Sequence, residues 1–331
     1  MGRLIRVVNQ LGMEVTFASV GAAIFDIRIP DQEGILKNVM VHPASLDDFE
    51  VSDAYYGKTI GRNAGRIKDG NFTLDGVHYH VEAATKDGLH GGIDGLPYRD
   101  FAFIERHLAD GEAVIFSYFS PDMECGFPGN LSLKVTYKLF AKENRLDVTY
   151  SANSDQKTIA NFTNHSYWNL NGGGTILNHN LTIRSSLAGK VDKKIYPLGI
   201  FPVDEQMDFR MGKVIGKDIA EKDLVAISGG YDHPFVIDNP EDSSQPVASL
   251  KGDFMQMDIY SDYPALVFYS GNYPSREKMN VAAVLGRYEA LALECQIFPD
   301  AMNEPFGQKE TGILEADEEF HHQISYRFKL I

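Results

Sequence analysis

One acidic residue lies where a strand could present it to a ligand. The run Glu289–Gln296 is typical of a strand, and its alternation puts the larger apolar side chains on one face. Glu294 lies on the other face, beside Ala292 and Gln296, and the small alanine leaves room for a ligand. Burial would raise the pKa of Glu294 toward neutrality, which suits a general base. The alternative is a surface glutamate on an edge strand.

A second polar segment, Asn161–Asn169, contains His165 and the only tryptophan. A polar row along one face is hard to bury without a ligand or a hydrogen-bond network. His165 is therefore a candidate for proton transfer, and the alternative is a hydrogen-bonded structural histidine. In an extended chain the residues on the face of His165 are Asn161, Thr163, His165, Tyr167 and Asn169.

Two glycine-rich stretches carry the other candidates. The first, Gly57–Ile67, contains Arg62, Asn63 and Arg66, and the second, Asp87–Gly92, contains His90. Glycine lets a backbone turn sharply and approach a ligand closely. Two histidines, one glutamate and one arginine in such contexts leave the reaction class open when only the residue types are considered.

Strands must position these residues, because strand-like runs recur along almost the whole chain and helical patterns are scarce. The runs are rich in Val, Ile, Phe, Tyr and Thr, and many alternate with period two. The pair Asp75-Gly76 between two alternating runs predicts a tight hairpin. Short helices are expected at Leu46–Val51 and within Met211–Leu224. The predicted strands are Glu14–Ala18, Asn38–His42, Phe101–Arg106, Ala113–Phe119, Leu131–Phe140, Arg145–Ser151, Asn180–Arg184, Pro234–Ile237, Met255–Tyr260, Ala265–Ser270, Ala290–Cys295 and Ile324–Leu330.

The expected fold class is all-β, a large and mostly antiparallel β-sandwich with few short helices. Strands that alternate with long helices would indicate a parallel sheet, and that alternation is missing. No linker, low-complexity tract or fixed-period repeat divides the chain. We therefore expect residues 1–331 to form a single domain.

The charge of the chain favours a neutral small molecule as its partner. The 331 residues include 31 basic and 46 acidic ones, for a formal net charge of −15. A field of this sign repels nucleic acid and anionic lipid and disfavours highly phosphorylated ligands. No run approaches the ~18 apolar residues that a membrane helix needs. The sequence predicts neither a nucleic-acid nor a membrane partner.

The cysteines and the first residues indicate the compartment. Cys125 and Cys295 fit reduced thiols better than a disulfide framework, and two cysteines are too few for a zinc site of their own. The first ten residues have no long apolar stretch and no small-residue cleavage site, so we expect no signal peptide. The glycines at 57, 61 and 65 do not form a dinucleotide fingerprint. The sequence predicts a cytoplasmic protein without metal or cofactor.

Several runs, in order along nearly the whole chain, resemble the aldose 1-epimerase family, also called galactose mutarotases. The resemblance implies a β-supersandwich with a sugar cleft on one sheet, which agrees with the predicted strands. The runs that carry it are Ile60–Ile67 (IGRNAGRI), Gly70–Gly76 (GNFTLDG), Leu89–Gly92 (LHGG), Asn164–Leu170 (NHSYWNL), Gly230–Phe235 (GYDHPF) and Leu293–Asn303 (LECQIFPDAMN).

The resemblance also implies roles for individual residues. It makes Glu294 the general base and His165 the general acid, with His90 as a second imidazole on the ring-oxygen side. Arg66 and Asp232 are the implied binders of sugar hydroxyl groups. The monosaccharide is then the small-molecule partner, and a monomer or a homodimer is expected.

Two positions depart from the family pattern. Gly65 stands where the family often has an asparagine just before the arginine, and Asn63 is the nearby amide that could bind substrate instead. Val267 replaces a glutamine sometimes found before the Phe-Tyr-Ser-Gly-Asn run. Both departures concern hydroxyl recognition, so the preferred sugar stays open.

The implied activity interconverts the α and β anomers of free aldohexoses such as galactose and glucose. It needs proton transfer at O1 and at the ring oxygen O5, which a carboxylate and an imidazole can provide. One alternative is a non-catalytic sugar-binding or sensor protein, although both acid and base are present. Another is a hexose-6-phosphate 1-epimerase, which the net charge and the lack of an arginine cluster beyond Arg62 and Arg66 disfavour.

Overall fold

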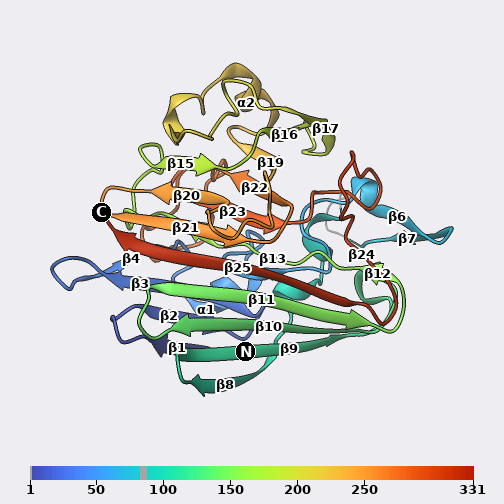
Figure 1. Ribbon diagram of the computed structural model, residues 1–331, viewed down its shortest axis with the longest axis horizontal. Coiled ribbons are helices and arrows are strands. Elements are labelled where there is room, and N and C mark those ends of the chain that lie inside the picture. The colour runs from blue at the N-terminus through green and yellow to red at the C-terminus, as the bar shows by residue number, and fades with distance from the viewer. Residues whose placement is uncertain (1, 83–87) are drawn as a thin grey trace.

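The largest element of the computed structural model, which describes residues 2–82 and 88–331, is a nine-stranded antiparallel sheet. Its strands run from β8 at the bottom of Figure 1 to β15 near the top. In β10 the burial of side chains alternates, so one face of this strand packs in the core and the other meets solvent. In spatial order the strands are β18 (Lys213–Val214), β15 (Asn180–Ile183), β20 (Ala248–Lys251), β21 (Met255–Ser261), β25 (Glu319–Leu330), β11 (Arg145–Ser154), β10 (Leu131–Phe140), β9 (Gly111–Ser120) and β8 (Ala102–Leu108).

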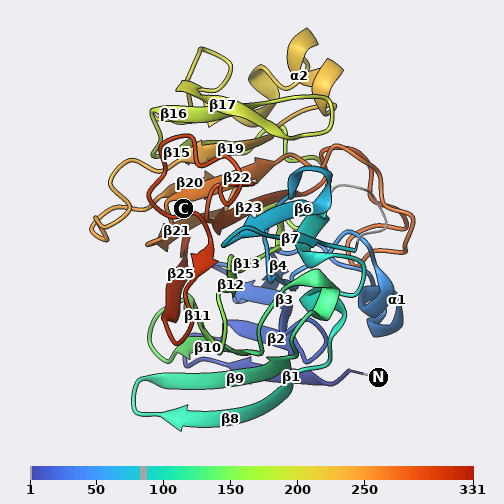
Figure 2. The same ribbon diagram turned by 90° about the vertical axis from the view of Figure 1, so that its right-hand side faces the viewer.

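Two further sheets cover the buried face of the nine-stranded sheet. The four-stranded sheet packs on it through Phe17 and Tyr137, whose ring centroids are 4.7 Å apart, and the six-stranded sheet packs on it through Trp168 and Tyr326, at 5.1 Å. In Figure 2 the nine-stranded sheet is at the left and these sheets lie to its right. The first has the order β1 (Leu4–Val8), β2 (Glu14–Ala18), β3 (Ala23–Pro30), β4 (Leu36–Asn38), and the second β14 (Tyr167–Trp168), β23 (Leu291–Gln296), β22 (Ala265–Tyr269), β19 (Asp232–Val236), β16 (Leu187–Val191), β17 (Pro197–Pro202).

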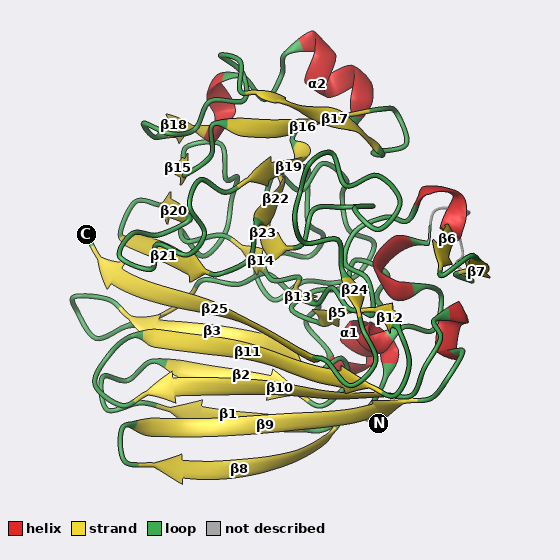
Figure 3. Cartoon of the chain, turned by 45° about the vertical axis from the view of Figure 1, so that its right-hand side comes forward, coloured by secondary structure: helices red, strands yellow, loops and turns green. Residues whose placement is uncertain are grey.

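Small elements complete the sandwich, and helices are few, as Figure 3 shows. Three strand pairs are β5 (Thr59–Ile60) with β13 (Thr163–Asn164), β6 (Asn71–Leu74) with β7 (Val77–His80), and β12 (Thr158–Ile159) with β24 (Ile313–Leu314). The α-helices of the described chain are α1 (Leu46–Val51) and α2 (Lys222–Ile227). The side-chain oxygen of Ser45 caps α1 by accepting from the Asp48 N–H. No helix within the described ranges is long and apolar enough to cross a membrane.

The antiparallel all-β prediction is confirmed, and several elements have the predicted bounds. Strands β2 and β10 and helix α1 begin and end at the predicted residues. The predicted hairpin is the β6–β7 pair, with Asp75 and Gly76 both at positive φ (49° and 80°), as a tight two-residue turn requires. Of the predicted glycine-rich stretch Asp87–Gly92, Asp87 lies outside the described residues.

One predicted element is wrong, and another is confirmed only in part. The strand expected at Asn38–His42 ends at Asn38, and Met40 makes only an isolated bridge with Trp168, because the segment turns into the interior between the sheets. Within Met211–Leu224 the structure has a short 3₁₀-helix, Ile215–Lys217, and the first turn of α2, which begins at Lys222, whereas Lys213–Val214 pair in β18. Gly212 at positive φ (80°) precedes that strand and ends any helix there.

The continuous polar row expected along Asn161–Asn169 does not form, because the segment is split between β13 and β14. The amide side chains of this segment bind backbone groups of neighbouring loops. Asn161 donates to the carbonyls of Ala64 and Ile297, and Asn169 donates to that of Glu289. A hydrogen-bond network therefore satisfies these amides, while His165 and Tyr167 face a cleft.

Arg62 is a structural residue of the loop region. Its guanidinium is buried and donates to the Ser120 hydroxyl (2.9 and 2.7 Å) and to the carbonyls of Pro121, Pro128 and Gly129 at 3.1, 2.9 and 3.0 Å. These bonds tie the loop after β5 to the ends of β9 and β10. Arg62 therefore has no free donor to offer a ligand.

Replacing Arg62 with methionine is expected to lower the free energy of unfolding by ~3 kcal/mol or more, because several buried carbonyl groups lose their donor. Arg62→Lys keeps the charge but cannot reach all of these acceptors, so an intermediate loss is expected. Urea denaturation monitored by tryptophan fluorescence measures both. A loss below ~1 kcal/mol in Arg62→Met would contradict the structural role.

Candidate active site

A cleft of about 380 Å³ opens over the six-stranded sheet. Its floor is formed by side chains on one face of β19, β22 and β23, and the loops around residues 55, 65, 90 and 275 form its walls. The floor residues are Asp232, Pro234, Val267, Tyr269, Glu294 and Gln296.

Glu294 lies in the middle of this floor. As predicted, Leu291, Leu293 and Cys295 face the core, and Glu294 points the other way into the cleft. The residue is 3 % exposed, and β23 is flanked by β14 and β22, so Glu294 is not a surface residue on an edge strand. Its Oε2 atom has no hydrogen-bond partner among the described residues. An unpartnered buried carboxyl group is costly and is available to a ligand.

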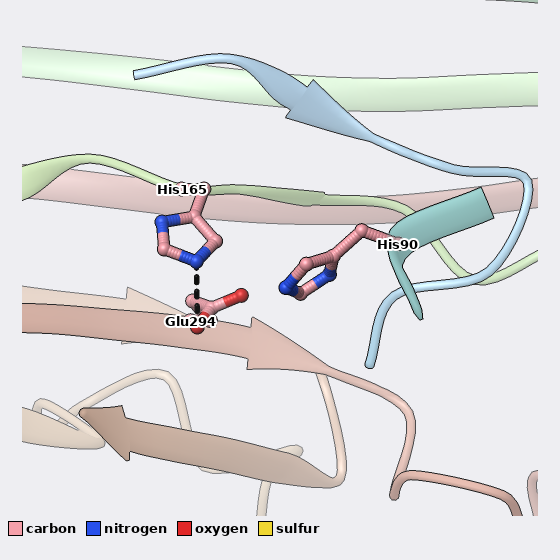
Figure 4. A group of neighbouring side chains, drawn as sticks. All are labelled: His90, His165 and Glu294. Atoms are coloured by element: carbon pink, nitrogen blue, oxygen red, sulfur yellow. Dashed lines mark ion pairs between the residues drawn. The ribbon is translucent and has the colours of Figure 1, made fainter. Parts of the chain in front are cut away.

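His165 lies directly beside Glu294. Its Nε2 atom is 3.5 Å from Oε1 of Glu294 (Figure 4). The backbone of His165 is fixed by two hydrogen bonds, one from its N–H to the carbonyl of Lys58 and one from the Gly57 N–H to its own carbonyl. The imidazole is therefore held over the carboxyl group by the pairing of its own segment with the loop before β5.

His90 completes the cluster from a separate loop, as Figure 4 shows. It adopts a left-handed conformation (φ 52°) in a short turn. The N–H of Gly65 donates to His90 Nδ1 at 3.2 Å, and the N–H of His90 donates back to the Gly65 carbonyl at 3.0 Å. Because Nδ1 accepts a hydrogen bond, the neutral ring carries its proton on Nε2. His90 therefore offers the cleft an N–H donor.

The burial of the cluster disfavours charge on each of its groups. Burial raises the pKa of Glu294 to about 8, with a further increase from Asp232 and an opposing effect of Arg66. Burial lowers the pKa of His165 to about 4 and holds that of His90 well below its usual value. Near neutral pH the empty cleft thus contains a protonated carboxyl group and two neutral imidazoles.

Arg66 and Asp232 line the same cleft from two different elements of the fold. Both line it, Arg66 from the loop after β5 and Asp232 from the start of β19. Within residues 2–82 and 88–331 neither side chain has a hydrogen-bond or ion-pair partner. Burial raises the pKa of Asp232 to about 6, against the influence of Arg66. A cation and a carboxyl group without protein partners are free to bind polar groups of a ligand.

Asn63 does not line the cleft. Its side chain is fully buried, and its Nδ2 atom is 3.4 Å from the carbonyl of Gly65. It therefore supports the loop that carries Gly65 and Arg66, and it is not among the residues that line the cleft. The other five predicted site residues are brought together at the cleft.

Tyr55, whose ring forms part of the cleft wall, is not among the site residues predicted from the sequence. Its ring lies 4.9 Å from that of His90 and 6.0 Å from that of His165, so it packs against both imidazoles. Tyr55 has φ of 58°, which a bulky residue rarely adopts. Its only sequence signal is its place just before the glycine-rich run. Tyr98 packs against Tyr55, and the buried ammonium of Lys58 lies 4.7 Å from the Tyr98 ring centre.

The same cluster has some features of a metal site. His90, His165 and Glu294 each offer one ligand atom, and these atoms lie within 4.8 Å of one another. However, Nδ1 of His90 already accepts the Gly65 N–H, and Nε2 carries the ring proton in the neutral form. Metal binding at Nε2 would require removal of that proton, so the donor set suits proton transfer and hydrogen bonding better.

The fold and the cleft together define an all-β protein with a buried acid–base cluster at a ligand-sized opening. A family model described as aldose 1-epimerase matches residues 3–327. The aldose 1-epimerase of Escherichia coli strain K12 is 31 % identical over 332 residues, which cover 98 % of this chain and 95 % of that protein. The galactose mutarotase of Homo sapiens is 32 % identical over 328 residues, 96 % of this chain and 92 % of that protein.

Solved structures agree with these sequence matches. An aldose epimerase homologue from C. elegans superposes with a TM-score of 0.90 at 28 % identity, over all of both chains. The galactose 1-epimerase from Lactobacillus acidophilus NCFM gives 0.87 at 27 % identity, over 99 % of this chain and 94 % of that one. This chain belongs to the aldose 1-epimerase family, whose named members are isomerases. The resemblance and the supersandwich fold expected from the sequence are confirmed.

Because Glu294 is buried, we expect the free energy of unfolding at neutral pH to be lower than it would be with a neutral side chain at this position. The pKa of this residue is about 8 in the folded state against 4.5 ordinarily, so its ionisation opposes folding. The resulting decrease in the free energy of unfolding is absent below about pH 4.5 and grows as the pH rises to about 8.

Glu294→Gln is therefore expected to raise the free energy of unfolding at pH 7 by up to ~3 kcal/mol, and to have little effect at pH 4.5. Urea denaturation at both pH values measures the difference. Glu319→Gln, at an exposed position at the start of β25, is the matched control and should change nothing. An equal effect of Glu294→Gln at both pH values would argue against a raised pKa.

Proposed function

We propose that this protein is an aldose 1-epimerase that interconverts the α and β anomers of free aldohexoses such as galactose or glucose. The observation that carries the proposal is the pair of His165 Nε2 and Glu294 Oε1, 3.5 Å apart at the floor of the cleft. The names of the relatives, aldose 1-epimerase and galactose mutarotase, support the same reaction.

The reaction moves one proton at each of two oxygen atoms. A base removes the proton from the O1 hydroxyl, and an acid delivers a proton to the ring oxygen O5 as the C1–O5 bond breaks. The resulting aldehyde turns about the C1–C2 bond, and closure on its other face reverses both transfers. O1 and O5 are bonded to the same carbon, so groups that contact them must be close neighbours. In this proposal Glu294 acts at O1 as base and His165 acts at O5 as acid.

The two groups need only one proton between them. In the empty cleft this proton is on Glu294, because burial favours the uncharged form of both groups. Its transfer to His165 gives the carboxylate and imidazolium that ring opening requires, with no change in the net charge of the site. Ring opening then returns a proton to Glu294 and leaves His165 neutral, ready for closure with the roles reversed.

The other cleft residues hold the sugar. His90 donates its Nε2 proton on the ring-oxygen side, where a neutral donor stabilises developing negative charge. Arg66 and Asp232 bind hydroxyl groups of the sugar, since neither side chain has a hydrogen-bond or ion-pair partner within the described residues. Such fixation contributes to the rate by holding C1 in line with the acid and the base.

A neutral sugar fits the cleft better than a phosphorylated one. Arg62, one of the two arginines of the glycine-rich stretch, is committed to backbone carbonyls. The cleft is lined by Arg66 and Arg276, but also by the acids Asp53, Asp232, Glu277 and Glu294. A phosphate group would meet more acidic than basic side chains. We further propose that the whole chain works as one domain in the cytoplasm, where its two free cysteines stay reduced.

Glu294→Gln is expected to lower the enzyme-catalysed rate of mutarotation by about 10²–10⁴-fold, because the base at O1 is lost. Polarimetry of freshly dissolved α-galactose measures the rate, after subtraction of the spontaneous reaction. Glu319→Gln is the control for the substitution itself. Wild-type activity in Glu294→Gln would remove this residue from the mechanism, and sugar binding by the wild-type protein without acceleration would favour a sensor.

The rate is expected to depend on pH with two limbs. Above about pH 8 the pair loses its single proton, and below about pH 4 it binds a second one, so kcat/KM should fall on both sides of this range. Polarimetry from about pH 3.5 to about pH 9.5, which spans both pKa values, measures the profile after correction for acid and base catalysis by the buffer. A rate that rises continuously through pH 8 would show that the alkaline form of Glu294 acts without a proton on its partner.

A further inference from the structure

The cleft floor has an ordered row of side chains across the sheet. The register pairs Val267 with Glu294 and Pro234 with Val267. On the other side of β23, Tyr167 pairs with Ala292. This pairing places His165 beside Glu294, with His165 Nε2 3.5 Å from Glu294 Oε1. The row therefore reads His165, in the loop just before β14, then Glu294 of β23, Val267 of β22 and Pro234 of β19.

The two neighbours of Glu294 in this row are chemically opposite. His165 is a polar acid–base group, whereas Val267 is an aliphatic side chain, 9 % exposed, that lines the cleft. Beyond it Pro234 continues the apolar surface, and Ile195 and Pro197 of the β16–β17 hairpin line the cleft at that edge of the sheet. The nearest polar floor residues, Gln296, Tyr269 and Asp232, each lie two positions along a strand from a member of the row, ~6.6 Å away along the sheet.

This row orients a bound sugar, given the proposed function on which the inference rests. C1 has two ring neighbours, O5 and C2, which diverge from it in different directions. When O1 lies on Glu294 and O5 lies toward His165, the ring continues from C1 on the side away from His165. That side is the one occupied by Val267 and Pro234, so C2 and its substituent lie over aliphatic groups.

We propose that Val267 is the residue that sets specificity at C2, and that the protein accepts aldohexoses with an absent or inverted 2-hydroxyl group. Neither Val267 nor Pro234 has a side-chain donor or acceptor to bind that group. A site that hydrogen-bonds a hydroxyl strongly rejects an analogue that lacks it, whereas an aliphatic surface does not. The substrate class thus includes 2-deoxy sugars and both C2 epimers, while Arg66 and Asp232 hold other hydroxyl groups.

The test compares catalysed mutarotation of glucose, 2-deoxyglucose and mannose, each expressed as kcat/KM over its own spontaneous rate. This correction removes the intrinsic reactivity of each sugar. The wild-type values for the three sugars are expected to agree within threefold. A loss of more than tenfold for 2-deoxyglucose or for mannose relative to glucose would overturn the proposal. Absence of catalysis on both glucose and galactose would instead overturn the proposed function, so the two failures are distinguishable.

Substitution at position 267 tests the assignment to this residue. Val267→Thr is nearly isosteric and adds a hydroxyl group, and Val267→Gln adds an amide with longer reach. At least one of them is expected to raise the preference for glucose over 2-deoxyglucose by about fivefold, the effect of one new hydrogen bond. Val267→Ala, the apolar control, should leave the preference unchanged. An unchanged preference in both polar variants, with catalysis of glucose retained, would overturn the role of Val267.

Discussion

The site depends on one constraint, the burial of a carboxyl group and an imidazole beside each other at the floor of a cleft. Glu294 and His165 are 3.5 Å apart, and the interior disfavours charge on either. Water would stabilise both ions and separate their pKa values in the usual order, with the carboxyl group ionised first. Burial reverses that order, and the pair then holds a single proton over a wide pH range. The acid–base chemistry proposed for this site, at two adjacent oxygen atoms, uses such a pair.

The sandwich makes this constraint possible because each member of the cluster is held by a different part of the fold. Glu294 is fixed by β23 between two neighbouring strands, and His165 by the hydrogen bonds of its backbone to the loop before β5. His90 is fixed by two reciprocal hydrogen bonds with Gly65. The adjacent Gly91 has φ of 87°, and a Cβ atom there would lie 1.8 Å from the carbonyl oxygen of Gly61. Only glycine allows the two loops to approach this closely.

Much of the fold could be predicted from the chain, since alternation and turn chemistry are local properties. Strand β10 and helix α1 have the predicted bounds, and the Asp75-Gly76 turn forms the predicted hairpin. The failures have a common cause in tertiary contacts. The Asn161–Asn169 segment reads as one extended strand, but its amides bind the backbones of other loops and break it in two. Arg62 and Asn63 stand near Arg66 in the sequence, yet both are buried and neither lines the cleft.

The sequence by itself determined the all-β class, the face of β23 on which Glu294 lies, and the family to which the chain belongs. These follow from side-chain periodicity and from short motifs, which need no knowledge of distant contacts. Only the tertiary structure decided which of the polar residues meet. Distances between residues 90, 165 and 294 depend on sheet order and register, as do the proton on His90 and the aliphatic surface beside Glu294. A pKa likewise depends on what surrounds a group after folding, so no local pattern can determine it.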